Sequence, residues 1–251
     1  MRLGALLGPV TDAGQPKFIA EQARMYAAEG YTSLWCAQAI GRGFMMPDPL
    51  LALTAAAAVT QHVELGTAVL QLPLYHPMDL AHRVFTLQQM CSAGLSLGVG
   101  AGSSVADFEA LARPYALRFR EFDAALAALR GIFTSGGLAD SQLSPWPVLG
   151  AGPPLLFGTW GHGVQRAAAE FSGWIASGHY RTTEEVCASL GVYRAAGGGR
   201  ALVSTLQIGA DTDQGALRAR LERFADAGFD DAVIMRLPGA PSAAEIRKWV
   251  R

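Results

Sequence analysis

Short apolar runs alternate along this sequence with longer segments in which apolar residues recur every three or four positions. The short runs are bounded by Gly, Pro or polar residues and are typical of buried strands, whereas the longer segments predict amphipathic helices. Strands are expected at residues 3–7, 33–37, 63–69, 95–99, 155–157, 174–176, 201–208 and 232–235. A helix is expected after each strand, the last at residues 243–250. Eight strands alternating with eight helices predict an α/β fold, the (β/α)8 TIM barrel.

Capping residues mark several of the expected helix ends. Asp48 before Pro49 predicts the start of an Ala-rich helix that reaches about residue 60, and His76 before Pro77 predicts another start. Thr182 or Thr183, with Glu185 close by, is expected to begin a later helix. A further helix is expected to place five apolar side chains on one face: Phe119, Phe122, Leu126, Leu129 and Phe133.

One segment interrupts this alternation. Residues 134–154 are rich in Gly, Ser and Pro and predict an irregular loop of about 20 residues, longer than a compact domain normally tolerates. Such a loop is either functional or a trimmed insertion. The rest of the barrel is expected to be compact, with few insertions.

Length and composition limit the function classes. The 251 residues suit one TIM-barrel domain spanning 1–251, and 51% hydrophobic residues provide a large core. A net charge of −1 without a cluster of Lys and Arg excludes nucleic acid as an expected partner, and no apolar run approaches the roughly 18 residues of a membrane span. Cys36, Cys91 and Cys187 are scattered, which predicts buried thiols in a reducing, cytoplasmic protein. The five histidines form no metal triad, so no metal is expected.

Gly-rich segments follow two of the expected strands. In parallel α/β folds, function gathers where strands end and helices begin. The segment 158–163 stands directly before a helix, so its backbone amides could hold a phosphate without a cationic side chain, although glycines also simply make tight turns. The segment 98–104 lacks the third glycine of a dinucleotide fingerprint. Its glycines could let a flat ring approach the backbone or merely let a helix pack.

The order of three motifs resembles the bacterial-luciferase-like family. These motifs are Gly66-Thr67-Ala68-Val69, then His76-Pro77, then Leu97-Gly98-Val99-Gly100-Ala101-Gly102. The resemblance implies a flavin- or deazaflavin-dependent oxidoreductase or monooxygenase on a TIM barrel, with FMN or coenzyme F420 as cofactor. It also implies a bulge with a cis peptide at Ala68-Val69 beneath the cofactor ring, and cofactor phosphate near Gly161.

The site residues implied by this resemblance come from five strand ends, four for the cofactor and one for the substrate. The cofactor-binding residues are expected to be Gln38, Thr67, Ala68, Gly100, Ala101, Gly102, Gly158, Thr159, Trp160, Gly161 and His162. His179 and Tyr180 are expected to contact the substrate, a small organic molecule. The resemblance also allows a separate reductase that supplies reduced cofactor.

Two departures from the family pattern keep other functions open. Luciferase carries a basic residue where this chain has Ala101, and many relatives carry a histidine where this chain has Gln38-Ala39. The catalytic base is therefore unknown. One alternative is a non-catalytic binding or partner subunit. The other is a non-redox TIM-barrel enzyme acting on a phosphorylated substrate, which would want a Lys or Glu at a strand end.

The helix expected at residues 49–60 also predicts an assembly. It is rich in Leu and Ala nearly all round, whereas the outer face of a barrel helix is normally polar. We therefore expect a homodimer whose interface includes this helix and the next one, with Ala56 and Ala57 as interface positions. The loop at residues 134–154 could instead cover the helix within one chain.

Overall fold

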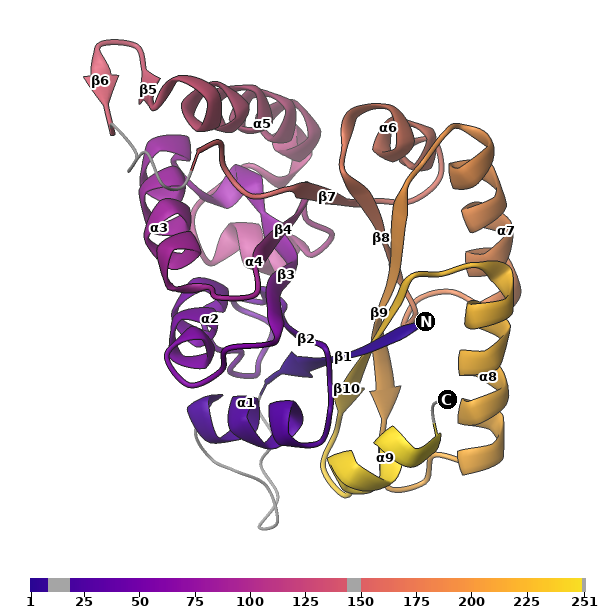
Figure 1. The fold of residues 1–251 in the computed structure, drawn as a ribbon. Helices are drawn as coiled ribbons and strands as arrows, with labels where there is room; N and C mark the ends of the chain where they lie inside the picture. Colours follow the sequence, from indigo (N-terminus) through magenta and orange to yellow (C-terminus); the bar gives the residue numbers. More distant parts are fainter. Residues whose placement is uncertain (9–18, 144–149, 250–251) are drawn as a thin grey trace.

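A closed barrel of eight parallel strands forms the centre of the protein. The structure is a computed structural model that describes residues 1–8, 19–143 and 150–249. Around the barrel the strands follow the order β1-β10-β9-β8-β7-β4-β3-β2, and every neighbouring pair is parallel. The helices lie outside this ring of strands (Figure 1). The predicted (β/α)8 TIM barrel is confirmed.

The strands and helices lie close to their predicted positions. The barrel strands are β1 (Arg2–Leu7), β2 (Ser33–Cys36), β3 (Glu64–Gln71), β4 (Leu95–Gly100), β7 (Leu155–Gly158), β8 (Gly173–Ser177), β9 (Arg200–Ile208) and β10 (Asp231–Arg236). The helices are α1 (Ile19–Ala28), α2 (Pro49–Ala57), α3 (Pro77–Met90), α4 (Val105–Glu109), α5 (Arg118–Ser135), α6 (Gly163–Glu170), α7 (Thr183–Ala195), α8 (Gln214–Ala227) and α9 (Ala243–Trp249). Short 3-10 turns, η1 (Leu72–Leu74) and η2 (Tyr115–Leu117), precede α3 and α5.

All three predicted helix starts are present, but only Asp48 and Thr182 make side-chain capping contacts, whereas His76 precedes α3 without a side-chain cap. The Asp48 carboxylate accepts hydrogen bonds from the amides of Leu50 and Leu51, each at 3.0 Å, and Pro49 is the first residue of α2. Thr182 and Glu185 form a complete capping box at α7. These side chains satisfy amides that a helix start otherwise leaves unpaired.

Two predictions about the middle of the chain are wrong. Part of the segment predicted to be irregular forms an antiparallel hairpin of β5 (Gly137–Leu138) and β6 (Ser141–Gln142), beyond the end of α5 (Figure 1). Residues 144–149 lie outside the described residues. Phe119 does not share the buried face of α5. It lies at the start of the helix and is 61% exposed.

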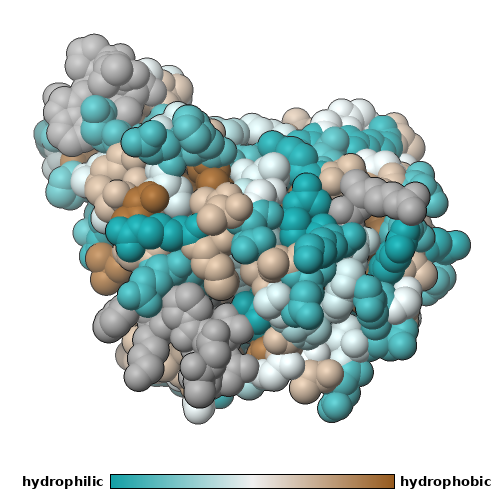
Figure 2. Space-filling model, turned by 60° about the horizontal axis from the view of Figure 1, so that its bottom comes forward, coloured by the Kyte–Doolittle hydropathy of each residue, from teal (hydrophilic) through white to brown (hydrophobic). Residues whose placement is uncertain are grey.

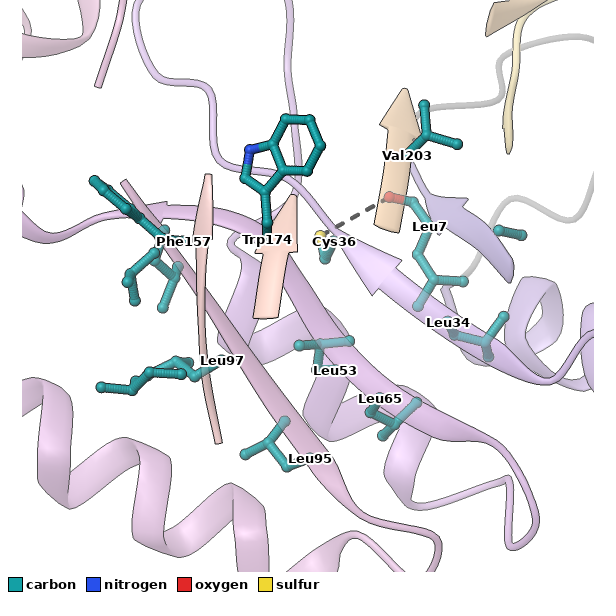
Figure 3. Packing of buried hydrophobic residues seen from close by; sticks show 14 of the residues in the cluster. Leu7, Leu34, Cys36, Leu53, Leu65, Leu95, Leu97, Phe157, Trp174 and Val203 are labelled. Carbon is teal, nitrogen blue, oxygen red and sulfur yellow. Dashed lines mark hydrogen bonds between the residues drawn. The ribbon is translucent and has the colours of Figure 1, made fainter. Parts of the chain in front are cut away.

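The apolar core has two parts, separated by the barrel wall. The larger part lies between the strands and the surrounding helices (Figure 3). The smaller part fills the barrel and draws on seven strands: Leu6, Trp35, Ala68, Leu156, Ile175, Leu202 and Val233. Trp35 is its largest member and is fully buried. A Cβ at Gly66 would lie 2.4 Å from the Trp35 ring, so the tryptophan needs glycine on the neighbouring strand.

Ion pairs close the N-terminal end of the barrel below Trp35. Arg200 contacts Glu64 at 2.6 Å and Asp231 at 2.8 Å, and Arg2 contacts the same two carboxylates. Burial alone would raise the pKa of Glu64, but hydrogen bonds from Arg200 and Ser96 outweigh it and lower the pKa. A ligand must therefore enter from the opposite end, where the strands finish.

The outer face of α2 differs from its prediction. Ala56 and Ala57 are buried in the core of this same chain, so choosing them as interface positions is wrong. The exposed side of α2 instead carries Leu51, which is 73% exposed, with Ala55 partly buried and Ala58 exposed. Hydrophobic patches are interspersed with hydrophilic residues on the face shown in Figure 2. An apolar outer face therefore exists on α2, formed by other residues than those predicted.

The cysteines and the membrane expectation can also be compared with the structure. Cys36 is buried as predicted, but Cys91 and Cys187 are only partly buried, so that prediction is wrong for both; all three are free thiols. No helix in the described part of the chain is both long enough and apolar enough to span a bilayer.

Candidate functional site

A set of apolar and hydroxyl side chains lies at the C-terminal ends of the barrel strands. Four apolar side chains belong to the barrel-filling cluster or pack on it from above: Ala37, Ala68, Val69 and Met235. Three hydroxyl residues follow on β8 and β9: Ser177, Ser204 and Thr205. We call these seven residues the barrel floor. One side of this floor is apolar and the other carries hydroxyl groups.

A bulge in β3 shapes the apolar side of the floor. The β3–β4 register shifts between Thr67 and Leu70, and the peptide bond between Ala68 and Val69 is cis. The predicted bulge and cis peptide are confirmed. Thr67 is fully buried and its hydroxyl donates to the Gly98 carbonyl at 2.7 Å, so its side chain supports the bulge from behind.

The glycines around this bulge are constrained by packing. A Cβ at Gly100 would lie 3.0 Å from Val69, and one at Gly158 would lie 2.6 Å from it. A Cβ at Gly98 would lie 2.0 Å from the Thr67 carbonyl oxygen. Gly98 and Gly158 must therefore be glycine for the bulge to fit, and Gly100 leaves room for a side chain only if Val69 shifts slightly.

The Gly-rich loop after β7 presents unused amides. The Trp174 indole donates to the Thr159 carbonyl at 3.0 Å, and Gly163 leaves room for the Thr159 hydroxyl. Gly161 has φ of +61° and open space where a Cβ would stand. Within the described residues no hydrogen bond occupies the amides of residues 159–162, which lead into the N-terminus of α6. A helix start with free amides favours an anion.

A cationic side chain from another loop lies against this loop, which contains no Arg or Lys of its own. The guanidinium of Arg181 lies 4.8 Å from the centre of the Trp160 ring. Arg181 comes from the next loop, between β8 and α7. It thus brings a positive charge, paired with Glu185 at 3.9 Å, close to the free amides. His162 is exposed and makes no side-chain cap at α6.

A buried network joins three other loops of the mouth; we call Gln38, Arg42, Gln71 and Asp107 the mouth network. Asp107 accepts hydrogen bonds from the Ile40 amide and Arg42 Nε, each at 2.9 Å, and from Gln71 Nε2 at 2.7 Å. A second Arg42 nitrogen completes the ion pair. The network fastens the β2–α2 loop to α4 and to the end of β3.

Gln38 joins this network through its amide oxygen and binds Tyr75 through its amide nitrogen. Its oxygen accepts from the Gln71 amide at 2.8 Å, and its nitrogen donates to the Tyr75 hydroxyl at 2.9 Å. Gln38 therefore joins two strand ends, a structural role that its prediction as a cofactor residue did not include. Gly102 supports the same network, because a Cβ there would lie 2.4 Å from Gln71 Oε1. Its neighbour Ala101 packs on the outer core.

The charge state of Asp107 follows from these contacts. Burial alone would raise its pKa, but hydrogen bonds from Arg42, Gln71 and the Ile40 amide outweigh burial and lower it. The carboxylate is ionised, fully buried and surrounded by donors. Because its lone pairs are occupied, Asp107 is poorly suited to take a proton from a substrate.

The predicted substrate residues lie on the rim. His179 and Tyr180 are both exposed, and their ring centres are 4.5 Å apart in an edge-to-face arrangement. Arg220 of α8 donates to the Gly178 carbonyl just before them. Other exposed apolar side chains stand on the loops that follow β2 and β4, among them Phe44, Met45, Val105 and Leu111. The rim therefore offers apolar and aromatic surface to a ligand.

Sequence reasoning missed the mouth network apart from Gln38, and it missed Arg181 and the hydroxyl side of the floor. Arg42 lies between two glycines and Asp107 in an expected helix, so neither stood out locally. No group of His, Cys, Asp or Glu suited to a metal ion occurs among the described residues.

The fold defines a TIM-barrel protein, with its candidate site at the C-terminal ends of the strands. The sequence profile of the Luciferase-like monooxygenase family matches residues 2–250. The chain belongs to this family.

Individual relatives are more distant. The chain is 32% identical over 114 residues to 4-hydroxyprotoasukamycin monooxygenase of Streptomyces nodosus subsp. asukaensis, a match that covers 43% of this chain and 31% of that protein. The matches span between 26% and 51% of the length of the curated relatives.

Solved structures share the fold at low identity. The coenzyme F420 dependent tetrahydromethanopterin reductase of Methanopyrus kandleri has a TM-score of 0.77 and 13% identity, covering 99% of this chain and 98% of that one. The oxygenating constituent of 3,6-diketocamphane monooxygenase of Pseudomonas putida, in complex with FMN, has a TM-score of 0.68 and 20% identity, covering 88% of this chain and 72% of that one.

Proposed function

We propose that this chain is an oxidoreductase that binds FMN or a deazaflavin such as coenzyme F420 and acts on a small organic substrate. The observation that carries the proposal is the row of free amides at residues 159–162, placed beside an apolar barrel floor. Family membership supports it, as do fold neighbours whose titles name FMN and coenzyme F420.

The residues present fit such a cofactor. Its phosphate would be held by the amides of residues 159–162, with the Arg181 charge nearby. Its ring would lie over Ala68, Val69 and Gly100, which offer a small and largely apolar surface. Bound there, the cofactor supplies redox chemistry that no amino-acid side chain provides.

The chain's own part in the reaction is to bind and orient. His179 and Tyr180, with the exposed apolar side chains of the rim, would hold an organic substrate above the ring. The mouth network would keep the β2–α2 loop in place at the edge of the site. Neither role requires a basic residue at the end of β2, where this chain has Gln38-Ala39.

The test is a binding titration with FMN, coenzyme F420 and riboflavin, read by absorbance and fluorescence. We expect at least one of the two cofactors to bind with low-micromolar or tighter affinity. If FMN is that cofactor, riboflavin should bind more weakly, because it lacks the phosphate. Gly161→Asp should abolish binding, since it places a carboxylate at the phosphate position.

Gly197→Asp is the matched control, because Gly197 also has positive φ and open space but lies before β9, at the closed end of the barrel. It should bind like the wild type. Arg181→Gln should weaken binding about three- to tenfold, the effect of one exposed charge-assisted contact. Unchanged affinity in Gly161→Asp would show that the phosphate assignment is wrong.

A further inference from the structure

Strand β9 contains a second bulge, on the opposite side of the barrel from the bulge in β3. Val203 pairs with Ala232 and Leu206 with Ile234, so β9 holds one extra residue at Ser204-Thr205. Around the barrel, three strands separate β9 from β3 in either direction. Bulges often re-aim a side chain beside an active site. The two bulges therefore face each other across the barrel floor.

The backbone of Thr205 is strained at this bulge. Its φ is +60°, a region that β-branched residues avoid because the side chain crowds the backbone. Ala112 and Ala139 share positive φ among the other non-glycine residues described, and both lie in turns outside the barrel. Glycine would adopt this conformation without strain. Strained residues of this kind gather at functional sites, so the Thr205 hydroxyl is a candidate for contact with a ligand.

The Thr205 hydroxyl is half of a polar pair. Thr205 Oγ1 lies 3.0 Å from Ser204 Oγ, and Ser204 is buried whereas Thr205 is partly exposed. One hydroxyl donates to the other, and no acceptor among the described residues takes the second hydroxyl hydrogen. Ser177 stands beside Ser204 on β8, and its oxygen accepts from the His179 amide at 3.3 Å. The pair thus keeps one free hydroxyl donor on the polar side of the barrel floor.

We propose that the Ser204–Thr205 pair donates a hydrogen bond to a carbonyl oxygen on the pyrimidine edge of the bound cofactor ring. This inference rests on the proposed function. Flavins and deazaflavins both have a flat ring system with carbonyl oxygens along one edge. A floor that is apolar on one side and carries a hydroxyl donor on the other complements such a ring in either cofactor. Thr205 is then a binding residue whose strained backbone aims its hydroxyl at the ring.

Two variants separate the hydroxyl from the backbone strain. Thr205→Val keeps the branched shape and removes the hydroxyl, and should weaken binding of the cofactor about three- to tenfold, the effect of one neutral hydrogen bond. Thr205→Gly also removes the hydroxyl but relaxes the backbone. It should bind as weakly as Thr205→Val while its Tm rises by about 2 to 4 °C.

Ala139→Gly is the matched control for strain. Ala139 has φ of +50° in the turn between β5 and β6. The control should raise Tm in the same direction and leave cofactor affinity unchanged. Agreement between these variants would show that the affinity loss at Thr205 comes from the hydroxyl.

Analogues of the cofactor identify the contacted atom. In 2-thio- and 4-thio-FMN, and in the corresponding thio-deazaflavins, one carbonyl oxygen is replaced by sulfur, a weaker hydrogen-bond acceptor. The wild type should prefer the oxygen compound over one of the two analogues about three- to tenfold, and Thr205→Val should lose that preference, as in a double-mutant cycle.

The outcomes distinguish this inference from the proposed function. Wild-type affinity in both Thr205 variants, with the preference for oxygen retained, would overturn the inference and leave the proposed function intact. Failure of the wild type to bind either FMN or coenzyme F420 would overturn both. If Thr205→Val does not fold, Thr205→Gly decides, because full affinity in that variant contradicts a ligand contact.

Discussion

Asp107→Asn tests whether the buried charge of Asp107 holds the mouth network together and stabilises the fold. The substitution keeps the size of the side chain and removes its charge. Oδ1 accepts from two donors, the Ile40 amide and Arg42 Nε, and Oδ2 accepts from two Arg42 nitrogens and from Gln71 Nε2. An asparagine NH2 group at the Oδ1 position would face two donors, whereas at the Oδ2 position it would face Arg42 and could donate to the unpaired Oε1 of a rotated Gln71 amide. In both orientations a hydrogen bond from Arg42 is lost, and Arg42 loses its counter-charge.

The expected loss of unfolding free energy follows from the burial of the Arg42–Asp107 ion pair. Breaking a buried ion pair by removing one partner costs about 3 to 5 kcal/mol. Since the Arg42 side chain is 25% exposed and can recover some hydration, we expect the lower end, about 3 kcal/mol of unfolding free energy. Urea denaturation followed by circular dichroism measures it as a lower midpoint at unchanged slope.

The control makes the same change at an exposed ion pair. Asp79 pairs with Arg83 on the surface of α3, where the two side chains are 49% and 51% exposed. Asp79→Asn should cost less than about 0.5 kcal/mol. If the two variants unfold at urea midpoints that differ by less than the equivalent of about 1 kcal/mol, the network does not stabilise the mouth as argued.

Three further predictions concern the fold and its assembly. Acid should unfold the protein, because the pKa values of Glu64 and Asp107 are lowered in the folded state. The stabilisation from these carboxylates is complete above about pH 5, where they are ionised even in the unfolded chain, and it is lost as the pH falls through their folded pKa values. A Glu64→Gln variant with an unchanged acid transition would contradict this. Gly98→Ala should lower the unfolding free energy by about 3 kcal/mol or more, because its Cβ would collide with the Thr67 carbonyl. Gly131→Ala, in open space on α5, should raise the unfolding free energy by about 0.5 to 1 kcal/mol, and equal urea midpoints for the two variants would refute the collision. Light scattering should show a homodimer that Leu51→Glu with Ala55→Glu converts to a monomer, and a monomeric wild type would end the assembly hypothesis.

The features that the sequence predicted correctly are those decided by near neighbours in the chain. Asp48 and Thr182 cap helices whose first amides lie within three residues. The bulge at Ala68-Val69 differs, because it was implied by the family resemblance and not by its neighbours in the chain. Hydrophobic periodicity identified the barrel because each strand and helix buries its own apolar positions. Such information is local, and it survives without knowledge of the tertiary structure.

The features that the sequence did not reveal depend on distant partners. Arg42 and Asp107 are separated by two helices and two strands, and only the closed barrel brings them together. The same holds for Arg181 on Trp160. Thr205 lies within a correctly predicted strand, but periodicity does not report that one residue of the strand has positive φ. Phe119 fitted the helical spacing and still fell at an exposed helix start.

The glycines of the mouth show how structure separates two explanations that the sequence left open. At Gly98 and Gly158 a side chain would collide with Thr67 or Val69, so the β3 bulge alone explains these glycines. At Gly161 a side chain would meet nothing, and only its positive φ favours glycine. Packing therefore accounts for the first two and leaves the space beside Gly161 unexplained. That space lies next to the free amides of residues 159–162. The assignment of these amides as the phosphate site therefore depends on Gly161, and the Gly161→Asp variant tests it.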